Sequence, residues 1–194
     1  CPGGPRGPCG RVHHARSLTN CDFVSNSAKD EAFGSVESMT AVGAVYQAEN
    51  ITNCNFISNR AEVQSPSDFQ VLKRFVSVGA IYNRSNKNTL TNCVFTRNKG
   101  IGKTRVARCF AAGSVYSENS VGFYTPPSYV KSTNCTFYKD SAWAETSSGG
   151  AHAGGSFFLR QDSLILNNSI VWGTYGNTTG TAPPAAVISR DTTI

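Results

Sequence analysis

The stretch Leu18-Thr-Asn-Cys-Asp-Phe-Val-Ser-Asn26 recurs along the chain. The gapless copies are Ile51-Thr-Asn-Cys-Asn-Phe-Ile-Ser-Asn59, Leu90-Thr-Asn-Cys-Val-Phe-Thr-Arg-Asn98 and Ser132-Thr-Asn-Cys-Thr-Phe-Tyr-Lys-Asp140. In a degenerate fifth copy, Leu166 to Gly173, we expect Asn168 at the Cys position and Ile170 at the Phe position. The cysteines of successive copies are 33, 39 and 42 residues apart. Such self-similarity indicates a repeat architecture.

A second motif alternates with the first. Its copies are Gly43-Ala-Val-Tyr46, Gly79-Ala-Ile-Tyr82, Gly113-Ser-Val-Tyr116 and Gly155-Ser-Phe-Phe158. Each unit thus holds short strand-like segments bounded by Gly or Asn, and these bury little surface unless the units stack. The units lack the 3.6-residue period of helical solenoids, and they have too few strands for a propeller blade.

These repeats predict an all-β parallel β-helix, a solenoid of about five coils with long loops on one side. We expect the coils to span residues 17–173, with no Gly-Ala-Ile strand before the first Asn-Cys motif. Residues 1–16 are rich in Pro and Gly and are expected to form a tail. Residues 174–194 are expected to form a C-terminal extension, as in a fragment of a longer chain.

Stacking in register would place like residues in columns, because neighbouring parallel strands lie about 4.8 Å apart. A ladder of Asn side chains suits turns, since Asn tolerates left-handed backbone. The expected structural columns are Asn20, Asn53, Asn92, Asn134 and Asn167; Cys21, Cys54, Cys93 and Cys135; Phe23, Phe56, Phe95 and Phe137; and Asn26, Asn59 and Asn98 with Asp140. Gly43, Gly79, Gly113 and Gly155 would mark corners.

The pairing of a Gly-Gly-Ala-Ile type motif with Phe-x-x-Asn resembles the repeats of the chlamydial polymorphic outer-membrane proteins. More broadly, the repeats are similar to those of right-handed parallel β-helix surface proteins. The resemblance covers about residues 17–173 and implies a right-handed coil at a cell surface. The double glycine is intact only at Gly154-Gly155.

The chain has seven cysteines, of which four belong to the repeated motif. We expect these four to be free, stacked and semi-buried, although neighbouring positions in a column are close enough for a disulfide. Cys1 and Cys9 could close a small loop. Cys109 is expected in a long loop, where it could pair with a tail or a neighbouring chain.

Asn-x-Ser/Thr sequons mark potential glycosylation sites. Five occur, at Asn50, Asn83, Asn134, Asn167 and Asn177. Asn134 and Asn167 fall in the expected turn ladder. Asn50, Asn83 and Asn177 are expected to be exposed and are the candidate glycosylation sites of a glycoprotein.

The charged residues do not suggest catalysis or nucleic-acid binding. The net charge is +6, and the only basic cluster, Lys99, Lys103, Arg105 and Arg108, is interpreted as a solvated loop. The acidic residues, Glu118 among them, are expected mostly in loops, with none recurring as the carboxylate pair that glycoside hydrolysis needs. We therefore expect no catalytic residue, metal, cofactor or nucleic acid. No apolar stretch is long enough to span a membrane.

Aromatic residues offer a possible contact surface, since they bind at low entropic cost. The candidates are Tyr46, Tyr82, Tyr116, Phe123, Tyr124 and Tyr129. Packing of these rings against their own coil is an equal alternative. We expect a non-enzymatic, extracellular or cell-surface structural protein or adhesin, such as a filament, whose partners are further copies or other domains. The alternatives are a polysaccharide lyase or hydrolase and a glycan-binding module.

Overall fold

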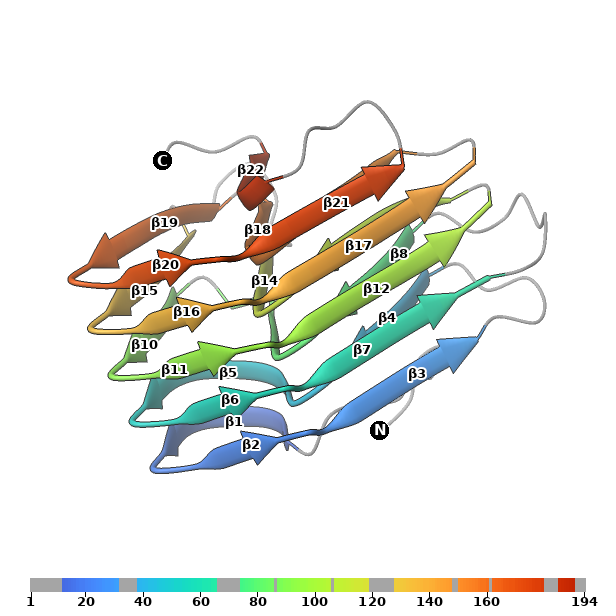
Figure 1. Cartoon of the computed structure of the whole chain (residues 1–194). Helices are drawn as coiled ribbons and strands as arrows, with labels where there is room; N and C mark the ends of the chain where they lie inside the picture. The colour runs from blue at the N-terminus through green and yellow to red at the C-terminus, as the bar shows by residue number, and fades with distance from the viewer. Residues whose placement is uncertain are drawn as a thin grey trace.

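The structure is a computed structural model, and every element in the part of the chain that it describes is a β-strand. The described residues are 12–31, 38–65, 74–85, 87–105, 107–118, 128–147, 150–160, 162–179 and 185–190, the last as backbone only. The described strands form three sheets (Figure 1).

Two sheets have five strands each, and the third has twelve. Sheet 1 consists of β2 (Asp22–Val24), β6 (Asn55–Ile57), β11 (Val94–Thr96), β16 (Thr136–Tyr138) and β20 (Ile170–Trp172). Sheet 2 consists of β3 (Ser27–Glu31), β7 (Arg60–Gln64), β12 (Lys99–Thr104), β17 (Ser141–Thr146) and β21 (Tyr175–Thr179). Sheet 3 consists of β1 (Val12–Thr19), β4 (Ser38–Val42), β5 (Val45–Thr52), β8 (Arg74–Val78), β9 (Ile81–Asn83), β10 (Lys87–Thr91), β13 (Arg108–Ala112), β14 (Val115–Glu118), β15 (Ser128–Thr133), β18 (Ala151–Arg160), β19 (Asp162–Asn167) and β22 (Ala185–Arg190).

The fold is a parallel β-solenoid, which confirms the predicted architecture. Each turn passes through all three sheets, and strands one turn apart pair in parallel, for example Val45 with Ile81 and Val115 with Phe157. The chain completes about four turns rather than the expected five coils. The difference is one of counting, because five copies of a motif enclose only four complete turns.

The strands extend beyond residues 17–173 at both ends, so the expected tail and extension contain part of the solenoid. β1 starts at Val12 and pairs with β5, with Val12 opposite Val45 and His13 opposite Tyr46. At the other end, β21 pairs with β17 and β22 pairs with β18. A strand therefore does precede the first Asn-Cys motif. By this register Gly10 aligns in the sequence with Gly43, and His13 stands where the motif has Tyr.

The register of the fifth motif copy differs by one residue from the expectation. Phe137 lies opposite Val171, so Val171 takes the Phe position and Ser169 the Cys position. Asn168, and not Asn167, joins the turn ladder, with φ of 45°. Ser169 replaces the thiol as a small polar group, and its Oγ accepts a hydrogen bond from the Cys135 backbone N–H at 3.1 Å.

The predicted Phe column is confirmed, and the predicted Asn column is confirmed except that Asn168 takes the place of Asn167. Neighbouring rings of Phe23, Phe56, Phe95 and Phe137 are stacked with centroids 4.6–4.9 Å apart. The five Asn residues of the turn ladder have positive φ, and Asn53 donates from its amide to Asn20 at 3.2 Å. The thiols of the Cys column are free and stacked, as expected, and all but that of Cys21 are buried.

A column of glycines brings sheet 3 against sheet 2 and divides the interior into two lobes. A Cβ atom on Gly79 would lie 2.5 Å from the Lys99 nitrogen, and one on Gly113 would lie 2.7 Å from the Ser141 nitrogen. Such distances leave no room for any other residue. One lobe holds the Phe column, and the other is filled mostly by small residues such as Ala61 and Ala111. We call the contact between the lobes the waist.

The expected second ladder, which we call the inner amide ladder, lies along the waist. Its members are Asn26, Asn59, Asn98 and Asp140. The Asn98 Oδ1 accepts hydrogen bonds from the backbone N–H and the side-chain amide of Asn59, at 3.1 and 3.0 Å. The Asn98 amide in turn donates to the Phe56 carbonyl at 2.9 Å and to Asp140 Oδ1 at 3.1 Å. Each buried amide is thus satisfied by the turns on either side.

The basic cluster does not form a loop, which corrects the expectation. Lys99 and Lys103 lie on β12 in the middle of sheet 2, and Arg108 begins β13. Within this segment Gly100 is buried, and a Cβ there would lie 2.6 Å from the Ser77 carbonyl oxygen.

Asp140→Asn should stabilise the protein. Asp140 lacks the amide protons that Asn59 and Asn98 donate, and its burial raises the pKa of its carboxyl to about 6. The folded state therefore binds the proton more tightly than the unfolded chain, and stability is lost as pH rises from about 4 to 6. We expect the variant to gain about 1–3 kcal/mol at pH 8 and to lose this pH dependence, measured by urea unfolding.

Asp22→Asn is the matched control, because Asp22 is exposed on sheet 1. Its effect should stay within about 0.5 kcal/mol. An Asp140→Asn variant that is less stable than the parent at pH 8 would contradict the role given to the ladder.

Candidate functional site

The expected aromatic contact surface is in part buried. Tyr46, Tyr82, Tyr116 and Phe158 stack in one column, with neighbouring centroids 5.0–5.3 Å apart. Tyr82 and Tyr116 are 3% and 0% exposed, so the prediction that they form a surface is wrong. Tyr116 instead packs against Tyr82, Phe110 and Phe158 of its own and the neighbouring turns, as the alternative of packing within the coil predicted. Tyr46 and Tyr129 are half-buried, and Phe123 and Tyr124 lie outside the described residues.

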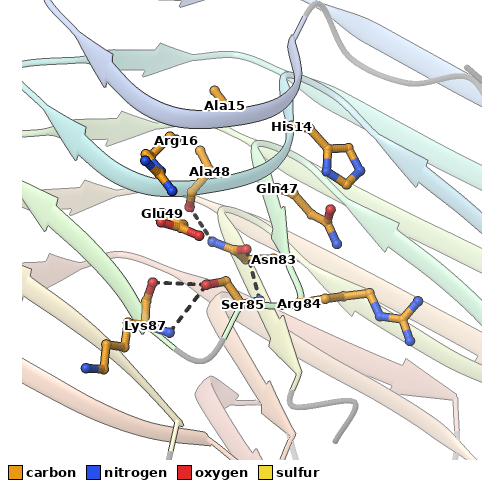
Figure 2. Close-up of a pocket in the computed structure, with 10 residues that line it drawn as sticks. All are labelled: His14, Ala15, Arg16, Gln47, Ala48, Glu49, Asn83, Arg84, Ser85 and Lys87. Atoms are coloured by element: carbon orange, nitrogen blue, oxygen red, sulfur yellow. Dashed lines mark hydrogen bonds between the residues drawn. The ribbon is translucent and has the colours of Figure 1, made fainter.

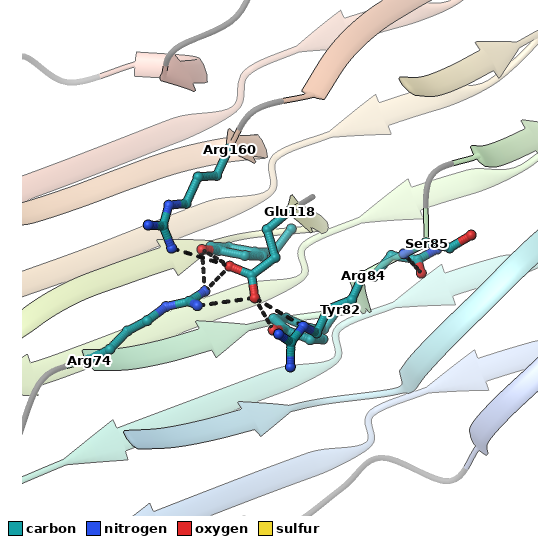
Figure 3. Close-up of polar contacts among 8 residues, drawn as sticks. Arg74, Tyr82, Arg84, Ser85, Glu118 and Arg160 are labelled. Carbon is teal, nitrogen blue, oxygen red and sulfur yellow. Dashed lines mark hydrogen bonds and ion pairs between the residues drawn. The ribbon is translucent and has the colours of Figure 1, made fainter. Parts of the chain in front are cut away.

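The buried tyrosine hydroxyls meet the carboxylate of Glu118 (Figure 3). Tyr82 donates to Oε1 at 2.6 Å and Tyr116 to Oε2 at 3.2 Å. Arg74 donates to both oxygens, through Nη1 at 3.0 Å and through Nη2. Glu118 ends β14 and its side chain is 3% exposed, so the expectation of a loop carboxylate is wrong.

Two further arginines approach the same carboxylate. Arg84 Nε lies 3.4 Å from Oε1, and Arg160 Nη1 lies 3.7 Å from Oε2. Burial alone would raise the pKa of Glu118, but the hydrogen bonds and charge of Arg74, with the help of Tyr82, hold that pKa below its usual value. Three guanidinium groups around one carboxylate leave an excess of positive charge. Glu118 is thus a firmly held anion rather than a proton donor.

A second carboxylate is buried nearby on β19. Asp162 accepts a hydrogen bond from the Ser128 hydroxyl, and its Oδ2 is buried without a partner in the described part of the chain. Burial raises the pKa of Asp162 to about 6, and the charge of Glu118 contributes. Of the two carboxylates, only Glu118 has arginine partners in the described part of the chain.

A groove of about 620 Å³ opens beside this cluster (Figure 2). We call it the basic groove; its lining residues are His14, Ala15, Arg16, Gln47, Ala48, Glu49, Asn83, Arg84, Ser85 and Lys87. In the first two turns the chain bends at one left-handed residue, His14 or Gln47. In the third turn the connection from Ile81 to Leu90 is longer than its equivalent from Val45 to Ile51. The groove lies between the longer connection of the third turn and the tighter bends at His14 and Gln47 in the first two turns.

Positive charge predominates along the groove. It is lined by Arg16, Arg84 and Lys87 against a single acidic residue, Glu49. Among the described residues, Arg16 and Lys87 form no ion pair. The side chains of Arg16, Arg84 and Lys87 are exposed. The groove can therefore attract an anion, which none of the sequence motifs predicted.

The candidate glycosylation sites differ in exposure. Asn83 is 2% exposed, and its amide donates to the Ala48 carbonyl, so its assignment as an exposed acceptor is wrong. Asn50 is exposed and Asn177 is half-buried. For these two residues, glycosylation stays a prediction.

The remaining candidate residues do not assemble into a site. Cys109 lies within β13 with a buried, free thiol, so the expected loop position is wrong; Cys1 and Cys9 lie outside the described residues. His13 stacks on Tyr46, and His152 stacks on Phe110. No group of three or more His, Cys, Asp or Glu residues in the described part of the chain could hold a metal ion. The described residues also contain no helix that could span a membrane.

The Glu118 cluster was missed although the sequence contains a signal for it. Arg84, Glu118 and Arg160 each stand two residues after the aromatic residue of the second motif. The register places Glu118 opposite Arg160. It also places Ser117 opposite Asn83, so the next residues along the two strands, Glu118 and Arg84, follow each other in the same column. Charges of alternating sign therefore occupy one column, and aligning the motif copies two residues further would have found them.

Glu118→Gln should destabilise the fold by about 3 kcal/mol, because it leaves the partly buried Arg74 without its counter-charge. Glu145→Gln is the matched control, since the Glu145 side chain on sheet 2 is 45% exposed and lies 4.0 Å from Lys103. The control should change stability by less than about 1 kcal/mol. Chemical unfolding at pH 7 measures both, and equal effects would show that the cluster does not contribute to stability.

Comparison with known proteins assigns no relative: no family model matches the chain, and no curated protein or solved structure matches it significantly.

Proposed function

We propose that this chain is a non-enzymatic structural or adhesive component of an assembly outside the cell or at its surface. The observation that carries the proposal is the apolar outer surface of the last described turn. Ile170 and Trp172 on β20 are 61% and 70% exposed, and Tyr175 at the start of β21 is 51% exposed. Exposed apolar side chains grouped in this way are typical of a protein contact.

Backbone groups next to these side chains favour the same interpretation. Among the described strands, β20 pairs only with β16, and β21 pairs only with β17. An unpaired strand edge is a template for pairing with another chain. Apolar side chains beside an open edge suit β-strand addition as well as burial of the rings.

The partner that best fits this edge is a second copy of the chain. At the opposite ends of the same sheets, β2 and β3 each have one described neighbour. Strands of neighbouring turns within the chain pair in parallel, as β2 does with β6. In the same way, β2 of one copy can pair with β20 of another and continue sheet 1. A contact between different ends repeats from copy to copy and builds an open filament.

The surface location rests on the resemblance of the repeats to those of β-helix surface proteins. A rigid stack of Phe and Asn columns suits a structural role, because each turn is held by the next. Release of products from pectin, alginate or glycosaminoglycan by the purified chain would contradict the non-enzymatic part of the proposal.

The assembly is tested by sedimentation of the purified chain over a range of concentrations. We expect the mean mass of the parent to rise with concentration. For Trp172→Ser the same rise should need a concentration at least about tenfold higher, since Trp residues dominate many interfaces. Trp143→Ser is the matched control: Trp143 is 37% exposed on β17, which is not an edge strand. A parent that stays monomeric, or equal losses in both variants, would refute the proposal.

A further inference from the structure

The basic groove has the properties of a binding site that no part of the proposed assembly uses. It opens at a corner of sheet 3, where β1 and β5 bend and the chain passes from β9 to β10 (Figure 2). The residues of the proposed contact between copies, Trp172 and Ile170, belong instead to sheet 1. The volume of the groove, about 620 Å³, is within the range of sites for small ligands.

We propose that the basic groove binds an acidic oligosaccharide through the carboxylate or sulfate groups of the sugar. Arg16 and Lys87 supply two exposed cations that form no ion pair within the described residues. Guanidinium and ammonium groups bind such oxyanions by charge-assisted hydrogen bonds. Glu49, the one acidic residue of the lining, cannot balance the three basic residues.

Arg84 joins the groove to the buried Glu118 cluster. Its contact with Glu118 is made through Nε, at 3.4 Å, and its side chain is 42% exposed. Its Nη groups therefore remain available to a ligand while the Nε contact holds the side chain in place. Because Arg74 already donates to both oxygens of Glu118, the charge of Arg84 is only partly compensated.

The remaining lining favours a sugar over the other polyanions. Apart from His14, the groove has no aromatic lining residue, whereas single-stranded nucleic acid is usually held by stacking on aromatic rings. The lining is also poor in large apolar side chains, which an acidic peptide with apolar anchors would need. Gln47 is half-buried in the lining, and its side-chain amide offers a donor and an acceptor to a sugar hydroxyl.

Direct binding measurements on the full chain test the proposal. The probes are a short heparin-derived oligosaccharide, an oligogalacturonate of similar length, neutral maltohexaose and a short single-stranded DNA. We expect at least one acidic oligosaccharide to bind at low ionic strength, with affinity falling as salt is added, and maltohexaose not to bind. Because heparin carries both sulfates and carboxylates, binding of the oligogalacturonate would show that carboxylates suffice, and binding of the heparin fragment alone would show that sulfates are needed.

Arg16→Gln and Lys87→Gln should each weaken that binding by up to about fivefold, as expected for exposed charge pairs. Lys99→Gln, the same charge change at an exposed residue of β12 in sheet 2, is the matched control and should bind like the parent. Neither groove variant removes a contact of the Glu118 cluster, and unfolding curves check that both fold.

Three results would overturn the proposal. They are no binding of either acidic oligosaccharide at low salt, an equal loss of affinity in the Lys99→Gln control, and tighter binding of the DNA than of both acidic sugars. None of these results bears on self-association, because sedimentation of the Trp172 variant reports on a different sheet. Failure of the groove and failure of the assembly can therefore be told apart.

Discussion

The hydrogen bonds of the inner amide ladder are the constraint on which the rest of the structure depends. A buried amide must find a donor and an acceptor, and in a dry interior an unsatisfied one is costly. Here the buried amides are satisfied mainly by groups of the neighbouring turns, as Asn59 is by Asn98 on one side and by the Phe23 carbonyl on the other. A shift of one turn by a single residue would break these bonds. The ladder therefore sets the register of the turns. The glycine column allows sheet 3 to approach sheet 2 closely at the waist, where the ladder lies.

Both candidate surfaces depend on this register. The buried Glu118 is tolerated because in-register turns bring Tyr82 and Arg160 from the neighbouring turns to it. The basic groove arises where the third turn departs from the repeat, in the longer connection between β9 and β10. Exact repetition stabilises the solenoid, whereas departures from it create the features that a ligand could distinguish.

The columns of identical residues could be predicted from the sequence because repetition of Phe, Asn and Cys reports directly on stacking. Three features could not be predicted in this way. β1 carries His13 where later turns carry Tyr, so its pairing is hidden. The fifth motif copy has lost both its Cys and its Phe. The Glu118 column alternates in the sign of its charge, and a search for like residues overlooks it.

Amide hydrogen exchange at Asn59 and Asn98 tests the central role of the ladder most directly. These two backbone N–H groups donate to side-chain oxygens, of Asn98 at 3.1 Å and of Asp140 at 2.9 Å, rather than to a carbonyl of the sheet. If the ladder holds the turns in register, both amides should exchange only on global unfolding, within about tenfold of the rate at Phe95. Exchange at Asn59 and Asn98 as fast as at the half-buried Ser85 of the groove would contradict the account.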